Sequence, residues 1–160
     1  MGYDMYRFTE AYSRPEDPDE EWDMPTGEYF RLNIWGMGKA RELAILGLAR
    51  PPIKEYELYV TALEEHGGNL LSSMALQKAF WDVHMPTSND PEHLIRRWFG
   101  SAAERFSSNG EIATAEDCGA FAECLHLTMT YLEENQLEIP EWLPGFIAWL
   151  ESCNYGAFIG

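Results

Sequence analysis

Residues 114–134 have the sequence TAEDCGAFAECLHLTMTYLEE, and this stretch decides the fold class. Apolar residues recur every three or four positions, which is the spacing of one face of an α-helix. Thr114 can cap the helix, and the acidic residues that follow favour its positively polarised N-terminus. We therefore expect a long helix packed on a core. Its inward residues are Cys118, Phe121, Ala122, Leu125, Met129 and Leu132, and its outward residues are Glu116, Glu123, Thr130 and Glu134.

Two other segments have the alternating pattern that is typical of strands. Residues 2–11 place Met5 on one face and Tyr6 and Phe8 on the other. Residues 28–35 alternate in the same way, and residues 157–159 could add a short third strand. The first two segments predict an antiparallel hairpin whose long connection, residues 13–27, is an exposed acidic loop.

The rest of the chain has helical spacing interrupted by proline and glycine. One helix is expected from Lys39 to the prolines at 51–52, and a second over residues 56–63. A third should begin at Ser72 or Ser73, and a fourth after Asp90, which is a good N-cap. A last helix is expected over residues 144–152. The sum is a single α+β domain over residues 1–160, with five or six helices covering a small antiparallel sheet.

Charge restricts the partners that the protein can have. The 160 residues include 27 Asp and Glu against 11 Lys and Arg, so the net charge is −16. Such a charge predicts repulsion from nucleic acid and from anionic membranes. Apolar residues make up 46%, which excludes an intrinsically disordered chain. With no membrane span or export signal in the sequence, and three cysteines expected to be reduced and buried, we expect a cytoplasmic protein.

The acidic loop is the first candidate site. Carboxylates this closely spaced can imitate a phosphate backbone, and the tryptophan among them could anchor a partner. We therefore expect a basic partner protein, held by the loop and by the acidic face of the long helix. The alternative is a solvated loop with no specific partner. The candidate partner-binding residues are Glu16, Asp17, Asp19, Glu20, Glu21, Trp22, Asp23, Glu116 and Glu123.

The second candidate site is the segment IWGMGKAR at residues 34–41. A strand, a Gly-x-Gly turn and a helix start would bring backbone N–H groups together around an anion, and two bases add positive charge. The third glycine of a dinucleotide-binding motif is absent, because Arg41 occupies its place. The alternative is an ordinary glycine turn before a helix. The candidate residues for a nucleotide or phosphate are Gly36, Gly38, Lys39 and Arg41.

Other chemistry has little support in the sequence. The loop has a superficial calcium-binding spacing, but Trp22 stands where the sharp turn needs glycine. The four histidines form no metal motif. No nucleophile elbow, His-Glu-x-x-His segment or phosphate-binding loop of the Walker type is present. We therefore expect no catalytic residues, no metal and no cofactor.

Two segments carry a resemblance to a known group. The opening MGYDMY and the later YFRLNIWGMG, residues 29–38, resemble small proteins of actinobacteria and their phages that have no assigned activity. The resemblance covers about the first 40 residues, with a looser likeness at the C-terminal end. It implies a phage-like setting, in which small acidic proteins often bind a host protein. Our first expectation is a non-enzymatic, phage-type inhibitor that covers a basic nucleic-acid-binding surface, and the alternative is a small-ligand binder.

Overall fold

The computed structural model of the chain describes residues 2–16, 23–67, 70–107 and 109–160. Its sheet contains the three predicted strands and one more. All neighbouring strands are antiparallel, in the order β2-β1-β4-β3. The hairpin and the C-terminal strand are confirmed. The additional strand, β3, has only three residues, which is too short for an alternating pattern to show. The strands are β1 (Gly2–Phe8), β2 (Thr26–Asn33), β3 (Glu111–Ala113) and β4 (Ala157–Ile159).

The first strand ends earlier than its sequence pattern predicts, at Phe8 rather than at residue 11. Its register with β2 shifts between Tyr6 and Phe8. The extra residue lies in β2, because the longer step from Tyr29 to Thr26 opposes the shorter step from Tyr6 to Phe8. Met5 is buried within the core cluster, whereas Phe8 is buried beside Tyr12, with 5.1 Å between the ring centroids.

The boundary between β2 and the first helix also differs from the prediction. Helix α1 (Ile34–Ala49) begins directly after β2, so the predicted strand end at residue 35 and the glycine turn are wrong. Asn33 caps the helix, and its side-chain Oδ1 accepts a hydrogen bond from the backbone N–H of Gly36 at 2.6 Å. Because this cap satisfies a free N–H of the first turn, the chain enters the helix without a loop. Gly36 and Gly38 therefore lie inside α1.

The remaining helices follow the predicted order, with differences at their starts. Helix α3 begins before either predicted serine cap. Helix α4 is capped by His93, whose Nδ1 accepts from Ile95 N at 3.2 Å, whereas Asp90 accepts from Glu92 N in the preceding turn. A π-helical turn, η1, follows α4 and was not predicted. The elements are α2 (Ile53–Glu65), α3 (Leu70–His84), α4 (Leu94–Arg97), η1 (Trp98–Ala102), α5 (Ala103–Arg105), α6 (Ala115–Glu134) and α7 (Leu143–Glu151).

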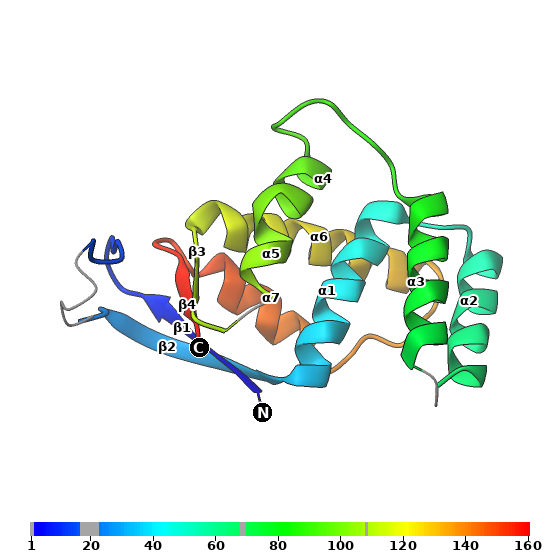
Figure 1. The fold of residues 1–160 in the computed structure, drawn as a ribbon, viewed down its shortest axis with the longest axis horizontal. Helices are drawn as coiled ribbons and strands as arrows, with labels where there is room; N and C mark the ends of the chain where they lie inside the picture. The colour runs from blue at the N-terminus through cyan, green and yellow to red at the C-terminus, as the bar shows by residue number, and fades with distance from the viewer. Residues whose placement is uncertain (1, 17–22, 68–69, 108) are drawn as a thin grey trace.

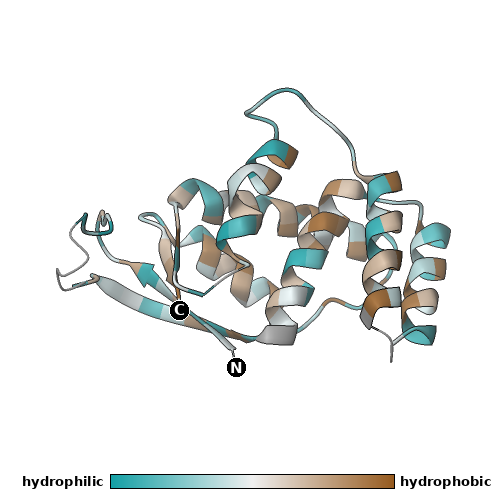
Figure 2. Cartoon of the chain, viewed as in Figure 1, coloured by the Kyte–Doolittle hydropathy of each residue, from teal (hydrophilic) through white to brown (hydrophobic). Residues whose placement is uncertain are grey.

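Helix α6 lies at the centre of the core, and its predicted start is confirmed. Thr114 Oγ1 accepts from Asp117 N at 3.1 Å, and Asp117 Oδ2 accepts from Thr114 N at 2.9 Å. The predicted inward residues are buried, apart from the half-buried Met129, and the predicted outward residues are exposed. Figure 2 shows apolar residues of α6 and α7 in the interior of the molecule.

The three cysteines have free thiols and are buried, as the sequence predicts. Burial raises the pKa of Cys124 to about 12, with a smaller contribution from the neighbouring Glu123 carboxylate. A thiol that stays protonated at neutral pH is a poor nucleophile and a poor metal ligand. The cysteines therefore belong to the packing of the core.

Helices α1 and α6 cross in backbone contact at Gly47. A Cβ atom at this position would meet the carbonyl oxygen of Cys124 and lie 2.7 Å from the backbone nitrogen of Thr128. The buried Thr128 hydroxyl is a hydrogen-bond donor to the Leu43 carbonyl on α1, and lies 3.0 Å from the Cys124 carbonyl on its own helix. Because glycine has no side chain, residue 47 allows the backbones of α1 and α6 to come into contact.

We expect Gly47→Ala to lower the free energy of unfolding by about 2 kcal/mol or more, because α1 and α6 would have to separate to admit the methyl group. Gly38→Ala is the matched control in the same helix, since no heavy atom lies within 4 Å of its Cβ position. It should raise stability by up to about 1 kcal/mol through helix propensity alone. Urea unfolding measures both, and equal effects of the two substitutions would contradict the close crossing.

Candidate functional site

The face of the sheet that points away from the core carries a row of apolar side chains, one from each strand. The row is formed by Tyr29, Tyr6, Phe158 and Ile112, which the register places directly opposite one another in that order. None of the four belongs to the buried core, and Tyr29 is 58% exposed. The rings of Tyr6 and Tyr29 have centroids 5.7 Å apart. We call this row, with the sheet surface around it, the outer sheet face.

The acidic loop borders the outer sheet face. A hollow of about 310 Å³ is lined by Tyr6 and Phe158 from the sheet, and by Asp23, Met24 and Thr26 from the end of the loop. At its other end the loop is tied down, because the Arg14 guanidinium donates to the Gly110 carbonyl just before β3. Figure 1 shows the described residues at the two ends of the loop at the end of the molecule opposite to α2 and α3. Aromatic rings and carboxylates are therefore placed on one surface.

Only part of the predicted acidic site can be located. Glu16 and Asp23 are exposed, whereas Asp17, Asp19, Glu20, Glu21 and Trp22 lie outside the described residues. Glu116 is exposed in the first turn of α6, just after β3. The register aligns the last residue of β3 with Ala157, and Ala157 with Arg7. The start of α6 and the start of the loop thus lie at the same end of the sheet, and the fold brings Glu116 towards the loop.

Glu123, by contrast, lies two helical turns further along α6. Its carboxylate forms an ion pair with Arg97 of α4, with 2.9 Å between Oε2 and the guanidinium Nη1. Its charge is therefore balanced within the protein, away from the loop. Helical spacing places Glu116 and Glu123 on one exposed face, but it does not show which neighbouring helix supplies a base. Only the packing of α4 on α6 reveals that pairing.

The predicted anion-binding segment faces a cleft between α1 and α3, which we call the α1/α3 cleft. Its volume is about 540 Å³. Gly38, Lys39 and Arg41 all line it, so the fold brings together three of the four predicted residues. Gly36 is not among them, and its N–H is occupied by Asn33. The residues that sequence reasoning missed here are Glu42, Ile45, Gln77 and Trp81, two of which come from α3.

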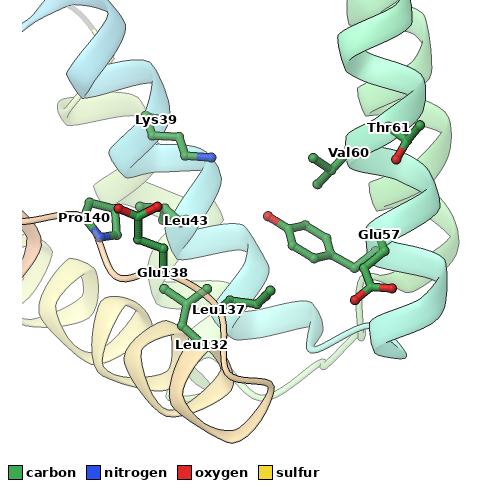
Figure 3. A pocket seen from close by; sticks show the side chains of 10 residues that line it. Lys39, Leu43, Glu57, Val60, Thr61, Leu132, Leu137, Glu138 and Pro140 are labelled. Carbon is green, nitrogen blue, oxygen red and sulfur yellow. The ribbon is translucent and has the colours of Figure 1, made fainter.

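A second cleft, of about 490 Å³, lies between α1, α2 and the segment after α6, and Lys39 lines this one as well. Its floor is apolar, with Leu43, Val60 and Leu132 among the lining residues. Figure 3 shows Lys39 and Glu138 on one side and Glu57 on the other. One cation and two carboxylates give no net attraction for an anion, so this cleft is the weaker candidate.

Two tyrosines of α2 lie beside these clefts and are held in their neutral form. Burial raises the pKa of Tyr56 to about 12, and the Glu42 carboxylate adds to the effect. Burial and the same carboxylate raise the pKa of Tyr59 well above its ordinary value. The Tyr59 hydroxyl donates to Glu42 Oε1 at 3.3 Å. Both phenols therefore act as hydrogen-bond donors at neutral pH, not as bases.

Metal and membrane sites find no support in the described part of the chain. No group of three or more His, Cys, Asp or Glu residues within it could hold a metal ion. The side chain of His84 contacts Glu55, with Nε2 2.9 Å from the carboxylate, and that of His126 contacts Glu151 at 3.2 Å. Among the same residues, no helix combines the length and the apolar character needed to cross a membrane.

Comparison with known proteins adds no assignment: no protein-family model, curated protein or solved structure matches the chain. Two surfaces of the molecule are candidates for function: the outer sheet face with its acidic loop, and the α1/α3 cleft.

The raised pKa of Tyr56 predicts a loss of stability in alkali. The unfolded chain ionises this phenol near its ordinary pKa of 10.0, whereas the folded protein keeps the proton until about 12. The free energy of unfolding should therefore fall as the pH rises through this window. In Tyr56→Phe the free energy of unfolding should fall less steeply with pH. The remaining fall comes from Tyr59 and Tyr131, whose pKa values are also raised. Urea unfolding at several pH values measures the slope, and an unchanged slope in the variant would refute the assignment.

Proposed function

We propose that this protein is a non-enzymatic binding protein that holds a basic partner protein with the outer sheet face and the acidic loop. It would thereby cover the surface with which that partner binds nucleic acid. The observation that carries the proposal is the placement of the aromatic row beside the acidic loop, with the hollow of about 310 Å³ between them.

This combination suits arginine and lysine side chains. The face of an aromatic ring attracts a cation, and Tyr6 and Tyr29 offer neighbouring rings on the outer sheet face. The carboxylates of Glu16, Asp23 and Glu116 lie at the end of the sheet from which the loop leaves. Tyrosine contributes large contact area with little loss of side-chain freedom, which is why it is common at the centres of interfaces.

Long-range electrostatics favour the same kind of partner. A net charge of −16 attracts a basic surface from a distance and repels nucleic acid that would compete for it. The partner's positive residues would then be engaged by carboxylates instead of phosphates. A phage-type inhibitor would act in this way.

The test is quantitative capture of proteins from a bacterial lysate by the immobilised protein and its variants. Tyr6→Ser with Tyr29→Ser removes the rings, and Glu16→Gln with Asp23→Asn and Glu116→Gln removes the local charge. The matched control is Glu64→Gln with Glu65→Gln and Glu133→Gln, which makes the same charge change at exposed residues away from the sheet. Thermal unfolding of each variant checks that it is folded.

We expect the wild type and the control to capture a basic protein, and both site variants to lose it at least about tenfold, which corresponds to 1.4 kcal/mol. Capture should weaken with salt, and duplex DNA or RNA should displace the partner. If the ring variant and the control capture the same proteins equally well, the outer sheet face is not the binding surface. If nucleic acid does not compete, the inhibitor mechanism is wrong.

A further inference from the structure

We infer that the α1/α3 cleft binds a small organic anion, with a carboxylate or phosphate group joined to an apolar body. The inference is independent of the proposed function. The cleft lies between helices α1 and α3, whereas the outer sheet face and the acidic loop lie at the other end of the molecule (Figure 1).

The first observation is the charge of the lining. Lys39 and Arg41 both face the cleft, and neither forms an ion pair with any residue that the structure describes. Most other bases do form one, at distances of 2.6–4.0 Å: these are Arg7, Arg31, Arg50, Lys78, Arg97 and Arg105. In a chain with 27 acidic residues against 11 basic ones, two bases that line one cleft and form no ion pair within the described residues mark this cleft as a place for an external anion.

The second observation is a buried donor without an acceptor. The guanidinium Nε of Arg41 is inaccessible to solvent and has no hydrogen-bond partner in the described part of the chain. Leaving such a donor unsatisfied is costly. A guanidinium presents a planar set of N–H groups that matches carboxylate and phosphate oxygens. Because Nε itself is closed to solvent, an anion in the cleft would be held by the rest of the guanidinium, which lines the cleft.

The third observation is an apolar, well-supported wall. Ile45 and Trp81 line the cleft. The indole of Trp81 stands edge-on to Phe80 and Tyr59, at centroid distances of 4.8 and 5.5 Å, and those two rings stack at 4.1 Å. The volume of about 540 Å³ lies within the range of small-molecule sites. The wall therefore suits the apolar body of a ligand, and the Gln77 amide beside it can donate or accept.

One carboxylate, that of Glu42, also faces the cleft. It accepts the hydrogen bond from Tyr59. Its single negative charge is smaller than the two positive charges of Lys39 and Arg41. The titratable lining thus keeps a net positive charge in a protein whose total charge is −16. This contrast distinguishes the α1/α3 cleft from the second cleft, where Lys39 meets two carboxylates.

Gly38 leaves space in the cleft because it has no side chain, and a larger residue at this position would fill that space. No heavy atom lies within 4 Å of a Cβ built on this residue, which lines the cleft from α1. A larger residue would improve the helix propensity of α1 and would project into open space. Gly38→Leu should therefore obstruct the cleft without unfolding the protein.

The experiment measures binding of benzoate and phenyl phosphate by isothermal titration calorimetry on the full chain. Benzamide serves as the neutral analogue, and inorganic phosphate as the anion without an apolar body. The variants are Arg41→Gln, which removes the charge, and Gly38→Leu, which obstructs the cleft. The matched control is Arg96→Gln, an equal charge change at an exposed arginine of α4. Thermal unfolding confirms that each variant is folded.

We expect at least one aromatic anion to bind the wild type and the Arg96→Gln control equally. In Arg41→Gln and in Gly38→Leu its affinity should fall about tenfold or more, the usual size for loss of a charged hydrogen bond. Benzamide and inorganic phosphate should each bind at least about tenfold more weakly. The difference between benzoate and phenyl phosphate shows which anionic group the cleft prefers. Absence of binding by both, unchanged binding by Gly38→Leu, or equal binding of benzamide overturns the inference.

Discussion

The contact between α1 and α6 at Gly47 and Thr128 holds the two halves of the molecule together. Helix α6 packs with α7 beneath the sheet, while α1 leads from β2 to α2 and α3 (Figure 1). Any side chain at residue 47 would meet the backbone of α6. The direction of α1, and with it the width of the clefts on both sides, therefore depends on the close approach of two backbones.

This arrangement separates two surfaces of opposite character. At the sheet end, aromatic rings lie beside carboxylates, and at the helical end two bases line a cleft. Between them, the ion pair of Arg97 with Glu123 neutralises part of the acidic face of α6. Surfaces that differ in this way would allow the proposed basic partner and the proposed small anion to bind without competing.

Elements that have a clear capping residue or a clear apolar period in the sequence were predictable, and elements without these patterns were not. Thr114 and the 3.6-residue period identified α6, because capping and amphipathic spacing both act within one helix. The bulge in β2, between Thr26 and Tyr29, escaped prediction because it is defined by the pairing of two strands and not by the pattern of either one. The glycine turn was wrong, because the Asn33 cap lets the helix start before Gly36, and two glycines do not prevent this.

The sequence by itself determined the fold class, the order of most elements, and the excess of acidic residues. These depend on local periodicity and on composition, which are properties of the chain before it folds. Only the tertiary structure decided that Glu123 is paired, that Tyr6, Tyr29 and Phe158 share one face, and that Arg41 meets Gln77 and Trp81 in a cleft. Each of these joins residues far apart in the chain, and strand register and helix packing alone bring them together.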